Sequence, residues 1–235
     1  MTLLSKSTAD RNEILHYFFR CRKIIPILLL LFSFTAIKTQ GKNFLPSDSA
    51  EIAKIFKVIR SGESQDLSKM LDEGADANAV MEGYSALMAA TLCGTLDQMK
   101  ILVAHGAKVN YSGRDSMTAL WMAIPYWDKT IFLLDHGADM FQVSKEGLTP
   151  FVKLAGLPGS AKLMNEFIAR GFDIKKCGGV DYLITNAAAT DDTAMLGIVL
   201  RAGVSPRNSL APLIGATNYS TFETLKMMVD NGADV

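Results

Sequence analysis

The apolar positions of this chain recur in short stretches with helical spacing, separated by loops that contain glycine. In the segments 96–103, 163–168 and 222–229, large apolar side chains fall three or four residues apart, as on one face of an α-helix. Each stretch is followed by a glycine, at position 106, 171 or 232. Because glycine readily adopts the left-handed conformation that ends many helices, the pattern predicts short helices that stop at these glycines.

These glycines belong to a regular series. Glycines lie at positions 74, 106, 137, 171, 203 and 232, so the steps between them are 32, 31, 34, 32 and 29. A second marker runs in phase with them: a Ser or Thr, then Ala or Pro, then a large apolar residue. It occurs at 85–87, 118–120 and 149–151, and in altered form at 181–183 and 211–213. A Ser or Thr there caps a helix start, so each period predicts a first helix, a second helix and a loop.

The two markers together resemble the ankyrin repeat, a unit of about 33 residues with T-P-L-H-x-A at its first helix. The matching segments are Thr118–Ala123, Thr149–Phe151, Gly74–Asn78 and Gly106–Asn110. The resemblance implies an all-α solenoid of about six stacked helix-turn-helix units with hairpin-like loops. We expect an ankyrin-repeat domain at 41–235, with repeats at about 47–78, 79–110, 111–141, 142–175, 176–207 and 208–235.

The segment 1–40 predicts an N-terminal signal peptide or signal anchor that precedes the repeats. Arg20, Arg22 and Lys23 come before an uncharged run at 24–37. This run is shorter than the roughly 20 residues that span a bilayer, and its length is typical of a signal peptide. We therefore expect an exported protein, periplasmic or secreted. If the run is not cleaved, it would anchor the chain in a membrane with the repeats facing away from the cytoplasm. A buried helix of a soluble protein is the third interpretation.

Charge and cysteine content narrow the possible partners. Residues 1–40 carry six of the 24 Lys and Arg and two of the 24 Asp and Glu, so residues 41–235 carry 18 basic and 22 acidic side chains. Their net charge of about −4 disfavours a phosphate backbone as partner, so we expect no nucleic acid. The three cysteines do not predict a disulfide framework.

The sequence predicts no catalytic, cofactor-binding or metal-binding residues. It contains no nucleophile elbow, phosphate loop or metal-binding His-Glu motif. His105 and His136 occupy equivalent positions in adjacent repeats, where they could suggest a metal pair, but no Cys or carboxylate cluster accompanies them. We interpret both as basic residues that interact with the C-terminal dipole of a helix. We therefore expect a protein that is not an enzyme and needs no cofactor or small-molecule substrate.

The resemblance implies that another protein binds at the loop tips and on the exposed side of the first helices. Tyr and Trp are frequent binding anchors, and Tyr126 and Trp127 fall where the two helices of one repeat join. Trp121 lies in a first helix, and for it we favour a packing role. The residues predicted to bind a partner protein are Glu82, Tyr84, Arg114, Asp115, Met117, Tyr126, Trp127, Lys145 and Glu146.

The predicted function is non-catalytic protein recognition outside the cytoplasm, as a scaffold, an inhibitor or a protector of a partner. One alternative is a targeting arm of a larger enzyme, because the sequence stops at Val235, inside a repeat, as a fragment would. The other alternative is a structural protein tethered to a membrane through residues 24–37.

Overall fold

The computed structural model describes residues 46–124, 126–207 and 221–233, without the side chains of residues 46–48. The chain divides into two units, Met1–Pro46 and Ser47–Val235, and all described residues except Pro46 lie in the second unit. The predicted signal or anchor run at 24–37 lies outside the described residues, and so does most of the predicted repeat at 208–235. Within the described part, no helix is both long enough and apolar enough to cross a membrane.

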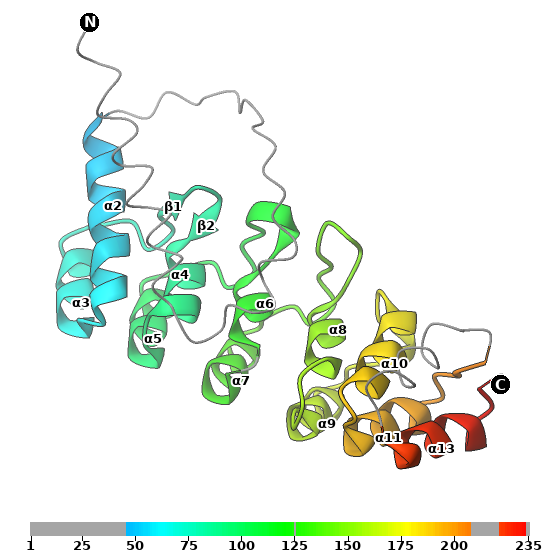
Figure 1. Cartoon of the computed structure of the whole chain (residues 1–235). Helices are drawn as coiled ribbons and strands as arrows, with labels where there is room; N and C mark the ends of the chain where they lie inside the picture. Colours follow the sequence, from blue (N-terminus) through cyan, green and yellow to red (C-terminus); the bar gives the residue numbers. More distant parts are fainter. Residues whose placement is uncertain (1–45, 125, 208–220, 234–235) are drawn as a thin grey trace, which may run out of the picture. The chain divides into compact units, whose positions relative to one another are not determined.

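The described residues of the second unit form helix pairs that follow one another along the chain (Figure 1). The pairs are α2 (Pro46–Ser61) with α3 (Ser64–Asp72), α4 (Ala86–Cys93) with α5 (Leu96–Ala104), α6 (Ala119–Ala123) with α7 (Trp127–Asp135), α8 (Pro150–Ala155) with α9 (Ala161–Ala169), and α10 (Val180–Ala189) with α11 (Thr193–Arg201). The last described helix is α13 (Phe222–Asp230), which packs on α11. This all-helical arrangement of repeated pairs confirms the α-solenoid class expected from the sequence.

Two short strands and two 3-10 turns lie in the loops between the helix pairs. Strands β1 (Val80–Met81) and β2 (Tyr84–Ser85) form an antiparallel hairpin between α3 and α4. The 3-10 turns η2 (Arg114–Ser116) and η3 (Ile174–Lys176) lie in two later loops. Each hairpin-like loop therefore joins the second helix of one pair to the first helix of the next pair.

The periodic glycines end the second helices as the sequence predicts. Gly106 has φ of 83° and Gly137 has φ of 78°, both in the left-handed region. After α5, Gly106 N donates to Val103 O at 3.0 Å and Ala107 N donates to Leu102 O at 2.9 Å. These two bonds form a Schellman motif, which satisfies carbonyls that a helix end leaves unpaired.

The predicted starts of the first helices are confirmed at three positions, but the predicted side-chain bond forms at one of them and is wrong at two. The Ser85 hydroxyl accepts from Met88 N at 3.2 Å and caps α4. Thr118 and Thr149 are also the N-cap residues of their helices, α6 and α8, but neither side chain accepts a hydrogen bond from its own helix. Thr149 Oγ1 instead lies 2.7 Å from Cys177 Sγ in a later loop, so its hydroxyl joins two repeats. Thr118 Oγ1 is buried without a hydrogen-bond partner among the described residues.

Neighbouring repeats are joined by polar side chains that reach back to the end of the preceding first helix. Lys129 Nζ on α7 donates to three carbonyl oxygens around the end of α4, those of Ala90, Thr91 and Gly94, at 2.6 to 3.2 Å. The other members of this series are Gln98 Nε2 to Val58 O at 3.2 Å, Lys153 Nζ to Trp121 O at 3.2 Å, and Asn186 Nδ2 to Val152 O at 2.9 Å. Each repeat therefore satisfies helix-end carbonyls of its neighbour.

Two asparagines make a second link, in the loops that follow the second helices. Asn110 Nδ2 donates to Gly137 O at 2.8 Å, and Asn110 Oδ1 accepts from Asp139 N at 2.8 Å. Asn78 makes the same pair of bonds one repeat earlier, to Gly106 O at 3.1 Å and from Lys108 N at 2.8 Å. We call these side chains the asparagine links.

Candidate functional site

The loops of three successive repeats are hydrogen-bonded to one another at their tips. Arg114 N donates to Gly83 O at 3.0 Å, which joins the β1–β2 hairpin to the next loop. Lys145 N donates to Asp115 O at 2.8 Å, which joins that loop to the following one. In Figure 1 these loops extend on the same side of α4, α6 and α8. We call their residues the tip surface: Glu82, Tyr84, Arg114, Asp115, Met117, Lys145 and Glu146.

The backbone of the tip surface contains residues in an uncommon conformation. Glu82 and Gly83, at the end of the hairpin, have φ of 51° and 84°, as the two-residue turn of a tight hairpin requires. Asp115 and Ser116 have φ of 56° and 59°. The left-handed conformation costs a non-glycine residue roughly 1–2 kcal/mol. Such strained residues cluster at binding sites, which makes this loop a candidate for a functional role.

Tyr84 is the half-buried aromatic residue of the tip surface. Burial raises the pKa of its hydroxyl, the carboxylates of Asp115 and Glu82 raise it further, and the nearby charge of Arg114 lowers it. The phenol is therefore neutral at physiological pH and lies among charges of both signs. A ring with one apolar side and a polar end, in a rigid loop, is typical of a binding anchor.

The third loop carries exposed charges on a fixed frame. Ser144 N donates to Leu148 O at 2.8 Å, which closes the loop. The buried Ser144 donates its hydroxyl proton to Glu146 Oε2 at 2.7 Å, and this bond lowers the pKa of Glu146. Lys145 and Glu146 are both exposed. The tip surface thus presents exposed charges of both signs, a pattern that suits a protein partner more than a uniformly charged polymer.

The structure places Tyr126 and Trp127 apart from the tip surface. Met117 precedes α6, whereas Tyr126 and Trp127 follow it, at the opposite end of this helix. Cations lie over both rings: Lys129 Nζ is 5.2 Å from the Tyr126 centroid, and Lys162 Nζ is 4.5 Å from the Trp127 centroid. Both rings therefore take part in contacts within and between helix pairs.

The two histidines of the repeats lie at the ends of second helices, as the sequence predicts. His105 and His136 are the C-cap residues of α5 and α7. His136 Nδ1 donates to Phe132 O at 2.7 Å, and His105 Nδ1 donates to Ile101 O at 2.8 Å. In the described ranges, no group of three or more His, Cys, Asp or Glu residues is arranged to hold a metal ion.

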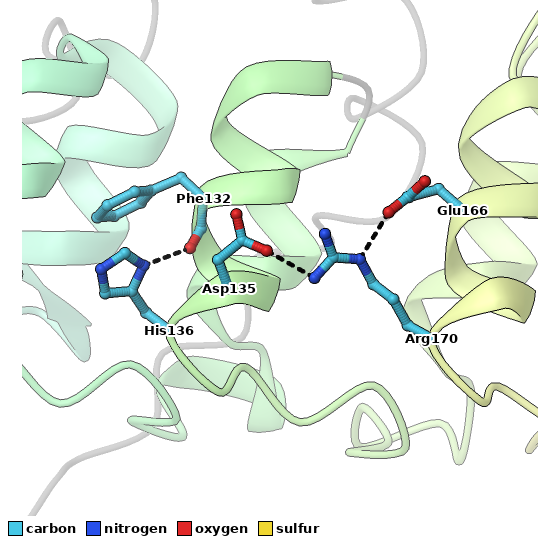
Figure 2. Close-up of polar contacts among 5 residues, drawn as sticks. All are labelled: Phe132, Asp135, His136, Glu166 and Arg170. Atoms are coloured by element: carbon cyan, nitrogen blue, oxygen red, sulfur yellow. Dashed lines mark hydrogen bonds and ion pairs between the residues drawn. The ribbon is translucent and has the colours of Figure 1, made fainter.

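Beside His136, an arginine links two helix pairs (Figure 2). Arg170 Nη1 donates to Asp135 at 2.7 Å and Arg170 Nε donates to Glu166 at 2.8 Å. The sequence analysis did not predict this contact. The signal for it was that Arg170 precedes its helix-ending glycine, just as His105 and His136 precede theirs. His105 makes the analogous contact, with Nε2 at 3.0 Å from Asp72 Oδ1 of the preceding pair.

Comparison with known proteins identifies the type of repeat. Residues 55–144 match the family model of ankyrin repeats, three copies of which it contains. A putative ankyrin repeat-containing protein of Treponema pallidum (strain Nichols) is 30% identical over 113 residues, which cover 46% of this chain and 36% of that protein. The matched part thus spans about a third of the length of the relative. The family match includes every residue of the tip surface except Lys145 and Glu146.

Proposed function

This chain is an ankyrin-repeat protein, with the family match at residues 55–144, and from that premise we propose that its tip surface holds a partner protein outside the cytoplasm. Ankyrin repeats are protein–protein interaction modules and in general not catalysts. The role that we propose for this chain is that of a scaffold, an inhibitor or a protector of its partner. It acts by binding alone and without a cofactor.

The main support for this proposal is the continuity of the tip surface. The bonds from Arg114 N to Gly83 O and from Lys145 N to Asp115 O fix three loops in one register. A surface that is already ordered loses little conformational entropy when it binds, which favours affinity. It also holds Tyr84 beside Arg114 and Asp115, so that one aromatic ring and charges of both signs meet the partner together.

The partner that we propose is a protein rather than a nucleic acid. Net charge over residues 41–235 is about −4, so the field of the repeats repels phosphate at long range. On the tip surface, the basic residues Arg114 and Lys145 alternate with acidic ones. Such alternation gives specificity for a complementary protein surface.

Affinity capture with matched variants tests this function. The full chain is used as bait in extracts of its native host, beside a tip variant, Tyr84→Ala with Arg114→Glu, and a control variant, Lys100→Glu. Lys100 lies on α5 with its side chain about half exposed, away from the loops. We expect one partner to be retained by the wild type and the control and lost by the tip variant. A partner retained equally by all three would refute binding at the tip surface.

The location outside the cytoplasm rests on the basic flank at Arg20–Lys23 and on the uncharged run at 24–37. Intact mass and N-terminal sequencing of the protein from soluble and membrane fractions of its host test this part. A soluble form that begins near residues 37–42 would support export with cleavage. An untrimmed form in the membrane would support the tethered alternative, and an untrimmed form in the cytoplasm would refute export.

A further inference from the structure

The residues equivalent to the asparagine links differ in the later repeats. Asn78 and Asn110 lie four residues after the helix-ending glycines 74 and 106. The positions four residues after the glycines 137, 171 and 203 carry Phe141, Lys175 and Arg207. In a stack of repeats, equivalent positions form a row. We call these three residues the loop-base row.

Each member of the row lies against the next repeat, as the asparagine links do. The ring of Phe141 stacks on that of Phe172, with centroids 5.3 Å apart. The Lys175 side chain covers Gly203, so that a Cβ added there would lie 2.9 Å from Nζ. Arg207 covers Gly232, and a Cβ there would lie 3.7 Å from Nη2. The row is therefore held in place by contacts between repeats.

Phe141 is an exposed aromatic residue on a rigid support. Its side chain is 43% exposed, whereas Phe172 below it is 3% exposed and stacks in turn on the buried Phe151. With phenylalanine at this position the two hydrogen bonds of an asparagine link are absent. Among the described residues, no other acceptor replaces the asparagine oxygen for Asp173 N. Val143, two residues further along, is 40% exposed. Preorganised aromatic side chains of this kind serve as binding anchors.

The row contains two exposed cations. Lys175 and Arg207 are exposed, and their side chains form no hydrogen bond or ion pair within the described ranges. The row has two acidic neighbours, and both are already engaged. Asp139 Oδ1 accepts from Phe141 N at 2.8 Å. Asp173 Oδ1 accepts from Lys175 N at 3.0 Å, and its Oδ2 lies 3.7 Å from Lys176 Nζ. An apolar anchor, followed by two cations whose side chains have no acidic partner among the described residues, is complementary to an acidic segment with an apolar side chain.

We propose that the loop-base row, Phe141 with Lys175 and Arg207, is a second binding surface of this protein, for an extended acidic segment of a partner protein that carries an apolar side chain. Packed helices lie about 8–10 Å apart, and an extended chain advances about 3.3 Å per residue. Every third residue of such a segment thus meets the next position of the row. This surface shares no residue with the tip surface, although Phe141 and Lys145 belong to the same loop between α7 and α8.

Peptide binding tests the proposal on the full chain. The probe is a short fluorescein-labelled peptide, composed of Asp and Glu with Leu-Phe at its centre and long enough in extended form to pass all three positions of the row. Two control peptides replace the acids by Asn and Gln, or the Leu-Phe pair by Ser-Gly. We expect the acidic apolar peptide to bind at least about ten times more tightly than either control, and its affinity to fall with added salt. Equal binding of the three peptides, or no binding of the first, would overturn the proposal.

Three variants locate the binding site. Phe141→Asn restores the residue type of the asparagine links, so it removes the anchor while its melting temperature should stay within about 3 °C of the wild type. The pair Lys175→Glu with Arg207→Glu reverses the charge of the row and gives independent evidence if Phe141→Asn fails to fold. We expect at least about tenfold weaker binding for both, and unchanged binding for Tyr84→Ala on the tip surface. Unchanged affinity in the folded row variants would refute the site, whereas loss in Tyr84→Ala alone would assign the peptide to the tip surface.

Discussion

Lys153 is a partly buried cation between two helix pairs, and its replacement by methionine should make the chain less sensitive to pH. From α8 its ammonium group donates to Trp121 O on α6 at 3.2 Å. Burial lowers the pKa of Lys153 from 10.5 to about 8. Methionine has a similar length and no charge, so Lys153→Met removes the desolvated charge and retains most of the packing.

The expected size of the effect follows from this pKa. Each tenfold change in a protonation equilibrium corresponds to about 1.4 kcal/mol. The desolvated charge therefore costs the folded chain about 3 kcal/mol at pH 7. Loss of the charged hydrogen bond to Trp121 O offsets about 1.5–3 kcal/mol of that gain in the variant. The net change in the free energy of unfolding at pH 7 is thus between zero and about 2 kcal/mol of stabilisation.

The dependence on pH is the sharper part of this prediction. Because the folded pKa is below the unfolded one, the unfolded chain binds more protons between about pH 8 and 10.5. The free energy of unfolding of the wild type should therefore rise with pH, by about 2 kcal/mol between pH 7 and 9.5 relative to Lys153→Met.

Urea denaturation, followed by tryptophan fluorescence at pH 7 and 9.5, measures the free energy of unfolding with a probe close to Lys153. The chain has two tryptophans, Trp121 and Trp127, and both belong to the pair α6–α7 next to Lys153. Lys100→Met, which removes an exposed charge from α5, is the matched control. A difference between Lys153→Met and wild type that is the same at pH 7 and 9.5 would refute the reasoning, since it would mean that the ammonium is solvated in the folded chain.

Three further substitutions test contacts between repeats. Asn110→Ala removes two bonds of 2.8 Å and should lower the free energy of unfolding by about 1–2 kcal/mol, whereas Lys108→Ala at an exposed neighbour should change it by less than about 0.5 kcal/mol in the same urea titration. The hydrogen bond of His105 to Asp72 raises the pKa of His105, and the bond to the Ile101 carbonyl raises it further. The stabilisation from the His105–Asp72 contact is therefore fully present below pH 6.5 and is lost as the pH rises through the pKa of His105 in the folded chain. Asp72→Asn should lower the pKa of His105 in an NMR titration, and an unchanged value would contradict the contact. Bonds from Thr224 Oγ1 at 2.6 Å and from Thr221 lower the pKa of Asp191, so their stabilisation of α13 is present above pH 3.8 and is lost as pH falls through the folded value. Asp191→Ala should speed hydrogen exchange in α13 and leave α5 unchanged, and equal rates in α13 would count against this link.

The repeat architecture could be predicted from the sequence because its signals are local. A glycine such as Gly106 ends a helix through bonds to the helix's own last turn, and the spacing of apolar residues fixes one face of the helix. These signals recur in phase, so the helix pairs follow directly. The side-chain bonds of the Ser and Thr residues that begin the first helices were predicted less well. A hydroxyl can accept from its own helix or bond to a neighbouring repeat, and the local sequence does not distinguish the two. Thr149 bonds to the loop at Cys177 and Ser85 to its own helix, although their local sequences look alike.

Contacts between repeats could not be predicted, because they depend on the register of one whole repeat against the next. Lys129 reaches the end of α4 from a helix 35–39 residues away, and no local pattern distinguishes it from a solvated lysine. The tip residues were found as separate loop positions, and only the bonds through Gly83 and Asp115 show that they form one surface. The cations above the rings of Tyr126 and Trp127 could not be predicted either, because they belong to residues further along the chain, and binding of a partner at these two rings stays a prediction.

Site-specific photo-crosslinking in the native host tests the central claim most directly. A photoreactive residue would replace Glu82 or Glu146 on the tip surface, or Lys100 on α5 as a control. The account predicts one discrete crosslinked protein from both tip positions and none from position 100. Crosslinks to the same protein from position 100 alone, or no protein crosslinked from either tip position, would contradict the claim that the tip surface holds a partner.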